Sequence, residues 1–160
     1  MAVGVIDSDG LGAVRDIPAG VRDDFPNRIL ILDGATGALQ KSLEFPDCQS
    51  IEQSEWSPDG RLLVVGSGFD GCERNGVRHW NEVYDTETWE RVAFLPSPVQ
   101  GGPGDGATLA FFGAEGQLTT LTAGGPAHSY AAGTFELEGT FDGINGLGNI
   151  SPDGTLIVSD

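Results

Sequence analysis

A four-residue turn that occurs more than once constrains the fold of this chain most strongly. Ser57-Pro-Asp-Gly60 returns unchanged as Ser151-Pro-Asp-Gly154, and Gly113-Ala-Glu-Gly116 and Asp7-Ser-Asp-Gly10 are degraded copies of it. Glycine accepts the positive φ of a tight turn, so an Asp-Gly or Glu-Gly pair between apolar runs favours a β-hairpin. The chain is therefore expected to consist of repeated hairpins.

A second turn recurs farther along the chain. Arg28 to Asp33 and Asn81 to Asp85 each read as a strand that ends in aspartate, and each is followed by a four-residue turn and another strand. Together the two turns predict four short strands in each repeat, and no segment keeps a helical period without Gly or Pro. We expect strands at 2–7, 11–16, 28–33, 38–44, 51–57, 61–67, 81–85, 90–95, 107–113, 117–122, 128–132, 134–141, 147–151 and 155–159.

The charge balance argues against several partner classes. The chain has 160 residues, of which 24 are Asp or Glu and 8 are Lys or Arg, so its formal net charge is −16. Nucleic acids and anionic lipid surfaces are bound by clustered Lys and Arg, and neither partner is expected here. No apolar run approaches the roughly 20 residues of a membrane-spanning helix, so no membrane association is expected.

The second repeat resembles a blade of the WD-repeat family. Ile51 to Gly71 contains Glu-Trp-Ser-Pro-Asp-Gly-Arg-Leu-Leu-Val-Val-Gly-Ser, and the later segment Glu82 to Val92 carries Tyr84-Asp85 where the family has its Trp-Asp pair. The resemblance covers nearly the whole chain, although no repeat has the family's Gly-His pair. Bacterial propeller domains that are attached to signalling ATPases or transcriptional regulators look similar.

The resemblance implies an all-β fold of four-stranded antiparallel β-propeller blades, about three and a half of which would be present. The blades would span about 1–46, 47–98 and 99–143, with the start of a fourth at about 144–160. Asp70 would be a structural residue in a turn, and Trp56 would pack between blades. A propeller closes with about 4–8 blades, so the chain is expected to be part of a longer propeller or to associate with itself.

No motif for catalysis, for a metal or for a cofactor is complete. Gly66-Ser-Gly-Phe-Asp-Gly71 matches a dinucleotide-binding glycine pattern, but no helical segment follows it. His79 and His128 are the only imidazoles, they fall in different repeats, and the chain has no Gly-x-Ser-x-Gly elbow. We therefore expect no catalytic residue, no metal and no cofactor.

The alternative function is that of a propeller enzyme of the lactonase, lyase or hydrolase type, because the fold alone does not choose between binding and catalysis. Such an enzyme would place polar residues from the first strand of several blades around the central channel. Those strands offer Glu52, Glu55 and Asn149, and the third repeat has no matching carboxylate. This pattern favours a binding module.

Two long insertions, at 16–27 and 68–80, favour a role in binding. They lie between the expected second and third strands of their repeats, and long loops on a rigid scaffold commonly carry binding sites. Aromatic residues and arginine are enriched in binding hot spots. The candidate partner-binding residues are Arg22, Asp23, Asp24, Phe25, Phe69, Arg74 and Arg78. The sequence thus predicts a non-catalytic scaffold for a protein partner, or a ligand sensor, within a larger regulatory protein.

The chain has two cysteines, Cys48 and Cys72. Their spacing fits no zinc or redox motif, and we expect two unrelated thiols, although the sequence alone leaves a disulfide between them open. The N-terminus lacks the basic and apolar regions of a secretory signal. A cytoplasmic location is therefore expected.

Overall fold

The computed structural model describes residues 2–6, 28–46, 48, 51–68, 73–97, 108–142, 148–151 and 156–159. Every regular element in these ranges is a β-strand, thirteen in all. Turn signals separate apolar runs of only a few residues, which suits strands and is too short for amphipathic helices. Within the same ranges, no helix has the length and apolar character needed to cross a membrane.

The strands form four antiparallel sheets in which neighbours in sequence are neighbours in the sheet. The first sheet contains β1 (Ala2–Ile6), β2 (Arg28–Asp33) and β3 (Leu39–Glu44). The second contains β4 (Ile51–Trp56), β5 (Leu62–Ser67), β6 (Trp80–Asp85) and β7 (Arg91–Pro96). The third contains β8 (Thr108–Phe112), β9 (Leu118–Thr122), β10 (Ala127–Tyr130) and β11 (Leu137–Phe141), and the fourth β12 (Gly148–Ile150) and β13 (Ile157–Ser159). The predicted all-β, antiparallel character is confirmed, and within the described residues no sheet closes on itself.

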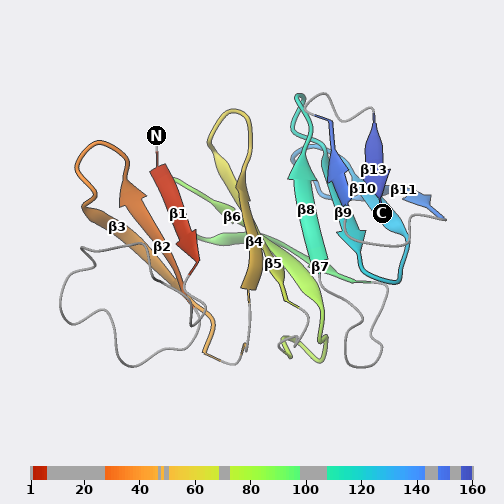
Figure 1. Cartoon of the computed structure of the whole chain (residues 1–160), viewed down its shortest axis with the longest axis horizontal. Helices are drawn as coiled ribbons and strands as arrows, with labels where there is room; N and C mark the ends of the chain where they lie inside the picture. The colour runs from red at the N-terminus through yellow and green to blue at the C-terminus, as the bar shows by residue number, and fades with distance from the viewer. Residues whose placement is uncertain are drawn as a thin grey trace.

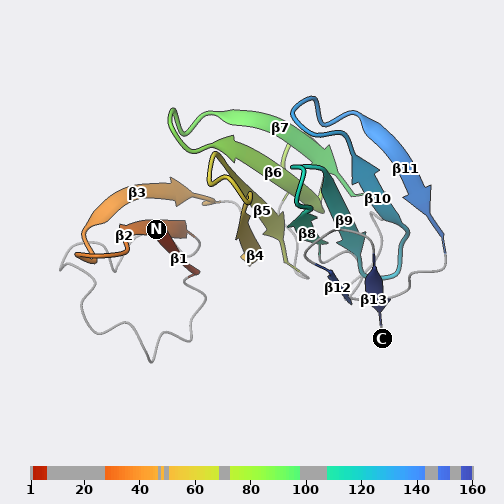
Figure 2. The same cartoon turned by 90° about the horizontal axis from the view of Figure 1, so that it is seen from above.

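The sheets follow one another in the order of the sequence (Figure 1), and seen from above they lie along an arc (Figure 2). Figure 2 shows the strands β4, β8 and β12 on the inside of this arc and β3, β7 and β11 on the outside. The second sheet packs its two faces against the first and the third sheets, and apolar side chains are buried at both contacts.

Two apolar cores lie between these facing sheets. Side chains alternate across a strand, so β5 places Leu63 and Val65 in the first core and Val64 in the second. Trp56 packs against the first core and is partly buried, as expected for a residue between two repeated units. The first core contains Ile29, Ile31, Leu43, Phe45, Cys48, Ile51, Leu63, Val65, Trp80 and Tyr84. The second contains Val64, Val83, Leu95, Ala110, Phe112, Leu118 and Tyr130.

The backbones of the second and third sheets approach closely at Gly66. A Cβ at this position would collide with the carbonyl oxygen of Thr108, so only glycine permits the approach. The hydroxyl of Thr108 in turn donates a hydrogen bond to the carbonyl of Trp80 at 2.9 Å. The two sheets are therefore held at a fixed separation by polar contacts as well as by the apolar core.

The first sheet differs from the sequence-based expectation. β1 pairs directly with β2, from Ala2 opposite Asp33 to Ile6 opposite Ile29. The predicted order, with a strand at 11–16 between them, is therefore wrong, and residues 11–16 themselves lie outside the described part of the chain. β1 thus pairs with β2 as β5 pairs with β6 in the second sheet, because a strand's partner is set by the whole sheet and not by the local turn sequence.

Cys48 lies in the connection between β3 and β4, buried in the first core, and it is disulfide-bonded. The expectation of unrelated thiols is therefore wrong for Cys48. Cys72, the one other cysteine of the sequence, lies outside the described residues.

Candidate functional site

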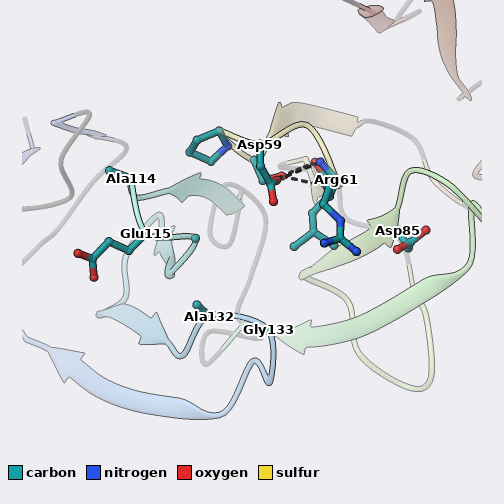
Figure 3. Close-up of a pocket in the computed structure, with 11 residues that line it drawn as sticks. Asp59, Arg61, Asp85, Ala114, Glu115, Ala132 and Gly133 are labelled. Carbon is teal, nitrogen blue, oxygen red and sulfur yellow. Dashed lines mark hydrogen bonds between the residues drawn. The ribbon is translucent and has the colours of Figure 1, made fainter.

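A pocket of about 600 Å³ opens between the second and third sheets, where their hairpin turns meet. Figure 3 shows Arg61 between Asp59 and Asp85 on one side of the pocket, with Ala114 and Glu115 on the other. The lining consists of Ser57, Pro58, Asp59, Arg61, Leu62, Asp85, Ala114, Glu115, Gly116, Ala132 and Gly133. A concave volume of this size is typical of ligand sites.

The repeated Ser-Pro-Asp-Gly turn builds one wall of the pocket. The hydroxyl of Ser57 donates to Oδ1 of Asp59 at 2.7 Å and accepts the N–H of Leu62 at 2.9 Å. The N–H of Arg61 donates to the same Asp59 oxygen at 3.0 Å, and Gly60 closes the turn with a φ of 73°. These two donors, the Ser57 hydroxyl first, lower the pKa of Asp59.

The turn between β6 and β7 brings a second carboxylate to the pocket. Oδ1 of Asp85 accepts the N–H of Glu87 at 2.9 Å, and it accepts the N–H and hydroxyl of Thr88 at 2.8 and 3.1 Å. The pKa of Asp85 is lowered, mainly by the N–H of Thr88. The hydroxyl of Thr86 donates to the carbonyl of Gly60 at 2.8 Å, which ties the two turns together at one end of the sheet.

The first sheet repeats this second turn away from the pocket. Oδ1 of Asp33 accepts the N–H of Ala35 at 3.1 Å and the N–H and hydroxyl of Thr36 at 2.8 and 2.7 Å. The third sheet has Ala131 in the corresponding place. Asp33 and Asp85 are therefore equivalent in local structure, and only Asp85 lines the pocket.

The pocket is net negative. Its lining contains three acidic residues, Asp59, Asp85 and Glu115, and one cationic residue, Arg61, which forms no salt bridge with any described residue. The lowered pKa values of both aspartates keep their charges over the physiological pH range. No cluster of three or more His, Cys, Asp or Glu that suits a metal ion occurs in the described part of the chain. The arrangement suits a cationic group.

A second charged cluster lies between the first and second sheets. Glu82 on β6 is fully buried and accepts hydrogen bonds from Nη1 of Arg74 at 2.8 and 2.6 Å. Nη1 of Arg91 and the hydroxyl of Tyr84 also donate to its carboxylate. Burial raises the pKa of Tyr84, and the bond to Glu82 adds to the shift. The cluster joins the loop before β6 to the sheet.

Most of the predicted partner-binding residues lie outside the described part of the chain. These are Arg22, Asp23, Asp24, Phe25 and Phe69, and the structural residue Asp70 does too. Arg74 stacks over the rings of Phe45 and Trp80, with its guanidinium carbon 5.1 and 5.4 Å from the ring centres. Arg78 is exposed in the same loop. A partner-binding role for this end of the sheets stays a prediction, and Arg74 has a structural role of its own.

The two histidines do not meet. His79 is fully buried before β6, and its carbonyl accepts the N–H of Ser97 at 2.8 Å. His128 on β10 is partly buried, and this burial lowers its pKa. Neither residue lines the pocket.

The inner strand β4 uses its polar side chains to bind backbone. Oε1 of Gln53 accepts the N–H of Ala110 at 2.6 Å, and Oε1 of Glu55 accepts the N–H of Phe112 at 3.2 Å. Burial raises the pKa of Glu55, and the bond from Phe112 partly offsets the shift. The side chains of the other residues considered for an enzyme, Glu52 and Asn149, lie outside the described part. Glu55 therefore fixes the third sheet to the second.

No protein-family model matches the chain, and no curated protein matches it significantly.

The pocket was not predicted from the sequence, because Asp59 was interpreted only as a turn residue and Arg61 and Asp85 only as the ends of strands. One signal could have found it. In an antiparallel meander, the turn after the first strand and the turn after the third emerge at the same end. Charged residues in both turn types therefore gather at that end, opposite the long insertions.

Proposed function

We propose that this chain is a non-catalytic, WD40-like β-propeller scaffold that binds a protein partner as part of a larger regulatory protein. The repeated antiparallel sheets, which face one another along an arc, support the propeller assignment. Such a stack of sheets is a rigid frame that presents its turns for recognition.

We infer that the partner inserts a basic segment into the pocket between the second and third sheets. The observation that carries this inference is a pocket of about 600 Å³ whose lining contains three carboxylates, Asp59, Asp85 and Glu115, and a single cationic residue, Arg61. The formal charge of −16 would also steer a cationic partner toward the molecule and repel an acidic one.

Binding of a labelled peptide tests this function. The probe is a Gly/Ser decapeptide with four lysines, compared with the same peptide carrying four glutamines. Asp85→Asn keeps the oxygen that accepts the turn hydrogen bonds and removes the charge from the pocket. We expect it to weaken binding of the lysine peptide by about fivefold or more, which corresponds to about 1 kcal/mol.

Asp33→Asn is the matched control, since it makes the same change in the same kind of turn outside the pocket. It removes the same net charge and should leave the affinity nearly unchanged. Equal loss in both variants, or equal binding of the glutamine peptide, would overturn the proposed site. If only a replacement of Arg78 weakens binding of the lysine peptide, the partner binds at the opposite end of the sheets.

The alternative, a propeller enzyme with a site on the central channel, has less support. A catalytic carboxylate has to be accessible to substrate and free to exchange a proton. Glu55 instead binds the backbone N–H of Phe112, and its second carboxylate oxygen accepts the side chain of Gln53 at 3.3 Å. The side chains of Gln53 and Glu55 on the inner strand β4 thus bind the backbone of the third sheet.

We propose an oxidising compartment in place of the expected cytoplasm. Disulfides persist where the surroundings are oxidising and are rare in reducing cytosol, and Cys48 is disulfide-bonded. Thiol labelling of protein purified without reductant should find no reactive cysteine, and Cys48→Ser should lower stability by about 2–4 kcal/mol. Free, reactive thiols in a protein that melts cooperatively would argue for the cytoplasm.

A further inference from the structure

Two guanidinium groups share one buried carboxylate between the first and second sheets. Nη1 of Arg74 contacts both oxygens of Glu82, and Nη1 of Arg91 contacts Oε1, one of the same two atoms. The two cations are therefore held within a few ångströms of each other. Such a pair of like charges repels strongly unless anions lie close by.

The carboxylate of Glu82 has no free acceptor position for further N–H groups of the two arginines. A carboxylate offers about four acceptor positions. Arg74 uses two of them, Arg91 one and the hydroxyl of Tyr84 one. Each guanidinium has five N–H donors, so both arginines keep donors for which the described residues provide no further carboxylate.

The cluster carries an excess positive charge within a strongly acidic chain. Two arginines face one carboxylate, and Lys41 on β3 pairs with Ile31, a residue of the core between the same two sheets. Lys41 therefore lies on the face of the first sheet that is turned toward the cluster. Two of the eight cationic residues of the sequence thus contact a single acidic side chain, and a third lies on the facing sheet.

The guanidiniums are both accessible and held in place. The side chain of Arg74 is 24% exposed and that of Arg91 39%. Arg74 lies over the rings of Phe45 and Trp80, and Arg91 lies over the ring of Phe94 at 5.5 Å. Stacking on aromatic rings fixes a guanidinium plane, so its free N–H groups are oriented before a ligand arrives.

We propose that Arg74 and Arg91 together bind a small oxyanion, a phosphate or a carboxylate, between the first and second sheets. The oxyanion supplies the second negative charge that Glu82 alone does not provide, and it accepts N–H groups that point away from Glu82. This site is separate from the acidic pocket between the second and third sheets and does not depend on the partner proposed for it.

Arginine side-chain NMR of the unaltered protein tests the proposal directly. Inorganic phosphate, acetate and chloride are titrated separately at low ionic strength while the Nε–Hε signals are followed. We expect saturable shifts of Arg74 and Arg91 with phosphate or acetate and no saturation with chloride, while Arg61 stays unchanged. The stronger of the two oxyanions identifies the ligand class. Absence of saturation with both, or equal shifts of Arg61, would overturn the proposal.

A variant pair provides the second measurement. Arg91→Gln leaves Glu82 paired with Arg74. We expect this variant to bind the oxyanion identified by NMR at least tenfold more weakly in calorimetric titration. Arg61→Gln removes an arginine of the same sheet outside the cluster and should leave that affinity unchanged. If Arg91→Gln does not fold, the NMR titration of the unaltered protein still decides. Undiminished affinity of a folded Arg91→Gln variant would contradict the site.

Discussion

A carboxylate without exposed surface, such as Glu82, is tolerated in a protein only when all its lone pairs are hydrogen-bonded. Here two arginines and Tyr84 provide those bonds. Burial alone would lower the pKa of Arg74, and the bond to Glu82 reverses the shift and raises it. The two charges therefore stabilise each other, and neither can be removed alone without cost.

Glu82→Gln should lower the free energy of unfolding by about 3 kcal/mol, because it leaves two guanidiniums without a counter-charge. The side chain keeps its shape, so the loss reports charge and not packing. Denaturant unfolding measures the effect. Glu87→Gln, an exposed turn residue, is the control and should change stability by less than about 0.5 kcal/mol. A loss no larger than that of the control would show that the cluster contributes little.

The role of Arg74 could not be read from the sequence. An arginine in a glycine-containing insertion looks like a surface residue, and Glu82 looks like the exposed member of an alternating strand. Their pairing depends on where the loop before β6 returns to the sheet, which is a tertiary property. Arg74→Ala therefore changes stability, so it does not test partner binding by itself.

At the scale of the elements, the turns were the most predictable part because their interactions are local. The N–H of Ser57 donates to the carbonyl of Leu62 at 2.9 Å, and the N–H of Ser151 donates to the carbonyl of Leu156 at the same distance. In both copies the serine hydroxyl also accepts the leucine N–H. The repeated sequence thus gives the same two serine–leucine hydrogen bonds in both copies, since the partners lie within six residues of each other.

The aspartates of the second turn predict a specific pH dependence. The Thr36 hydroxyl lowers the pKa of Asp33 below 3.8, and the Thr88 N–H does the same for Asp85. Because the folded pKa is below the unfolded one, their stabilisation is present above about pH 4 and is lost as the pH falls through the folded value. Replacing both by Asn should flatten the fall in melting temperature between about pH 5 and pH 2.5. Parallel curves would contradict these hydrogen bonds.

The contact between the second and third sheets can be tested at Gly66. Gly66→Ala places a methyl group against the carbonyl of Thr108, so the sheets must separate or shift. We expect a loss of stability of about 1–3 kcal/mol, the usual cost of overpacking. Thermal unfolding measures it. An unchanged melting temperature would mean that the sheets are farther apart than the structure shows.

The strand pairing of the first sheet was not predicted correctly from the local turn sequence. Asp7-Ser-Asp-Gly10 resembles the hairpin turns of the later repeats, and it predicted a strand at 11–16. In the structure β1 pairs with β2 instead. The choice between a near and a distant partner strand is made by burial of the apolar face, which a turn signature does not encode. The pocket was missed for a similar reason, since its walls come from two sheets.

At the scale of the whole molecule, the third and fourth sheets carry exposed apolar residues. Leu137 and Phe141 on β11 are 55% and 47% exposed, and Leu156 before β13 is 67% exposed. We expect the 160-residue chain to bind a hydrophobic dye and to associate as its concentration rises.

Dye fluorescence and light scattering check this expectation. Phe141→Gln and Leu137→Gln should reduce both signals without lowering the melting temperature, because these side chains are already half exposed. Val92→Gln on β7 changes an exposed residue of the second sheet and serves as the control. A sharp monomer without dye binding would contradict the expected need for further blades or self-association.

The most direct test of the account is to locate the basic peptide on the protein by amide chemical-shift mapping. The lysine decapeptide is titrated into uniformly labelled protein, and the residues that shift are placed on the arc of sheets. Binding at the turn end predicts shifts at Gly60, Arg61, Gly116 and Gly133, which line or border the pocket. Shifts confined to the loop of Arg74 and Arg78, at the opposite end, would contradict the account.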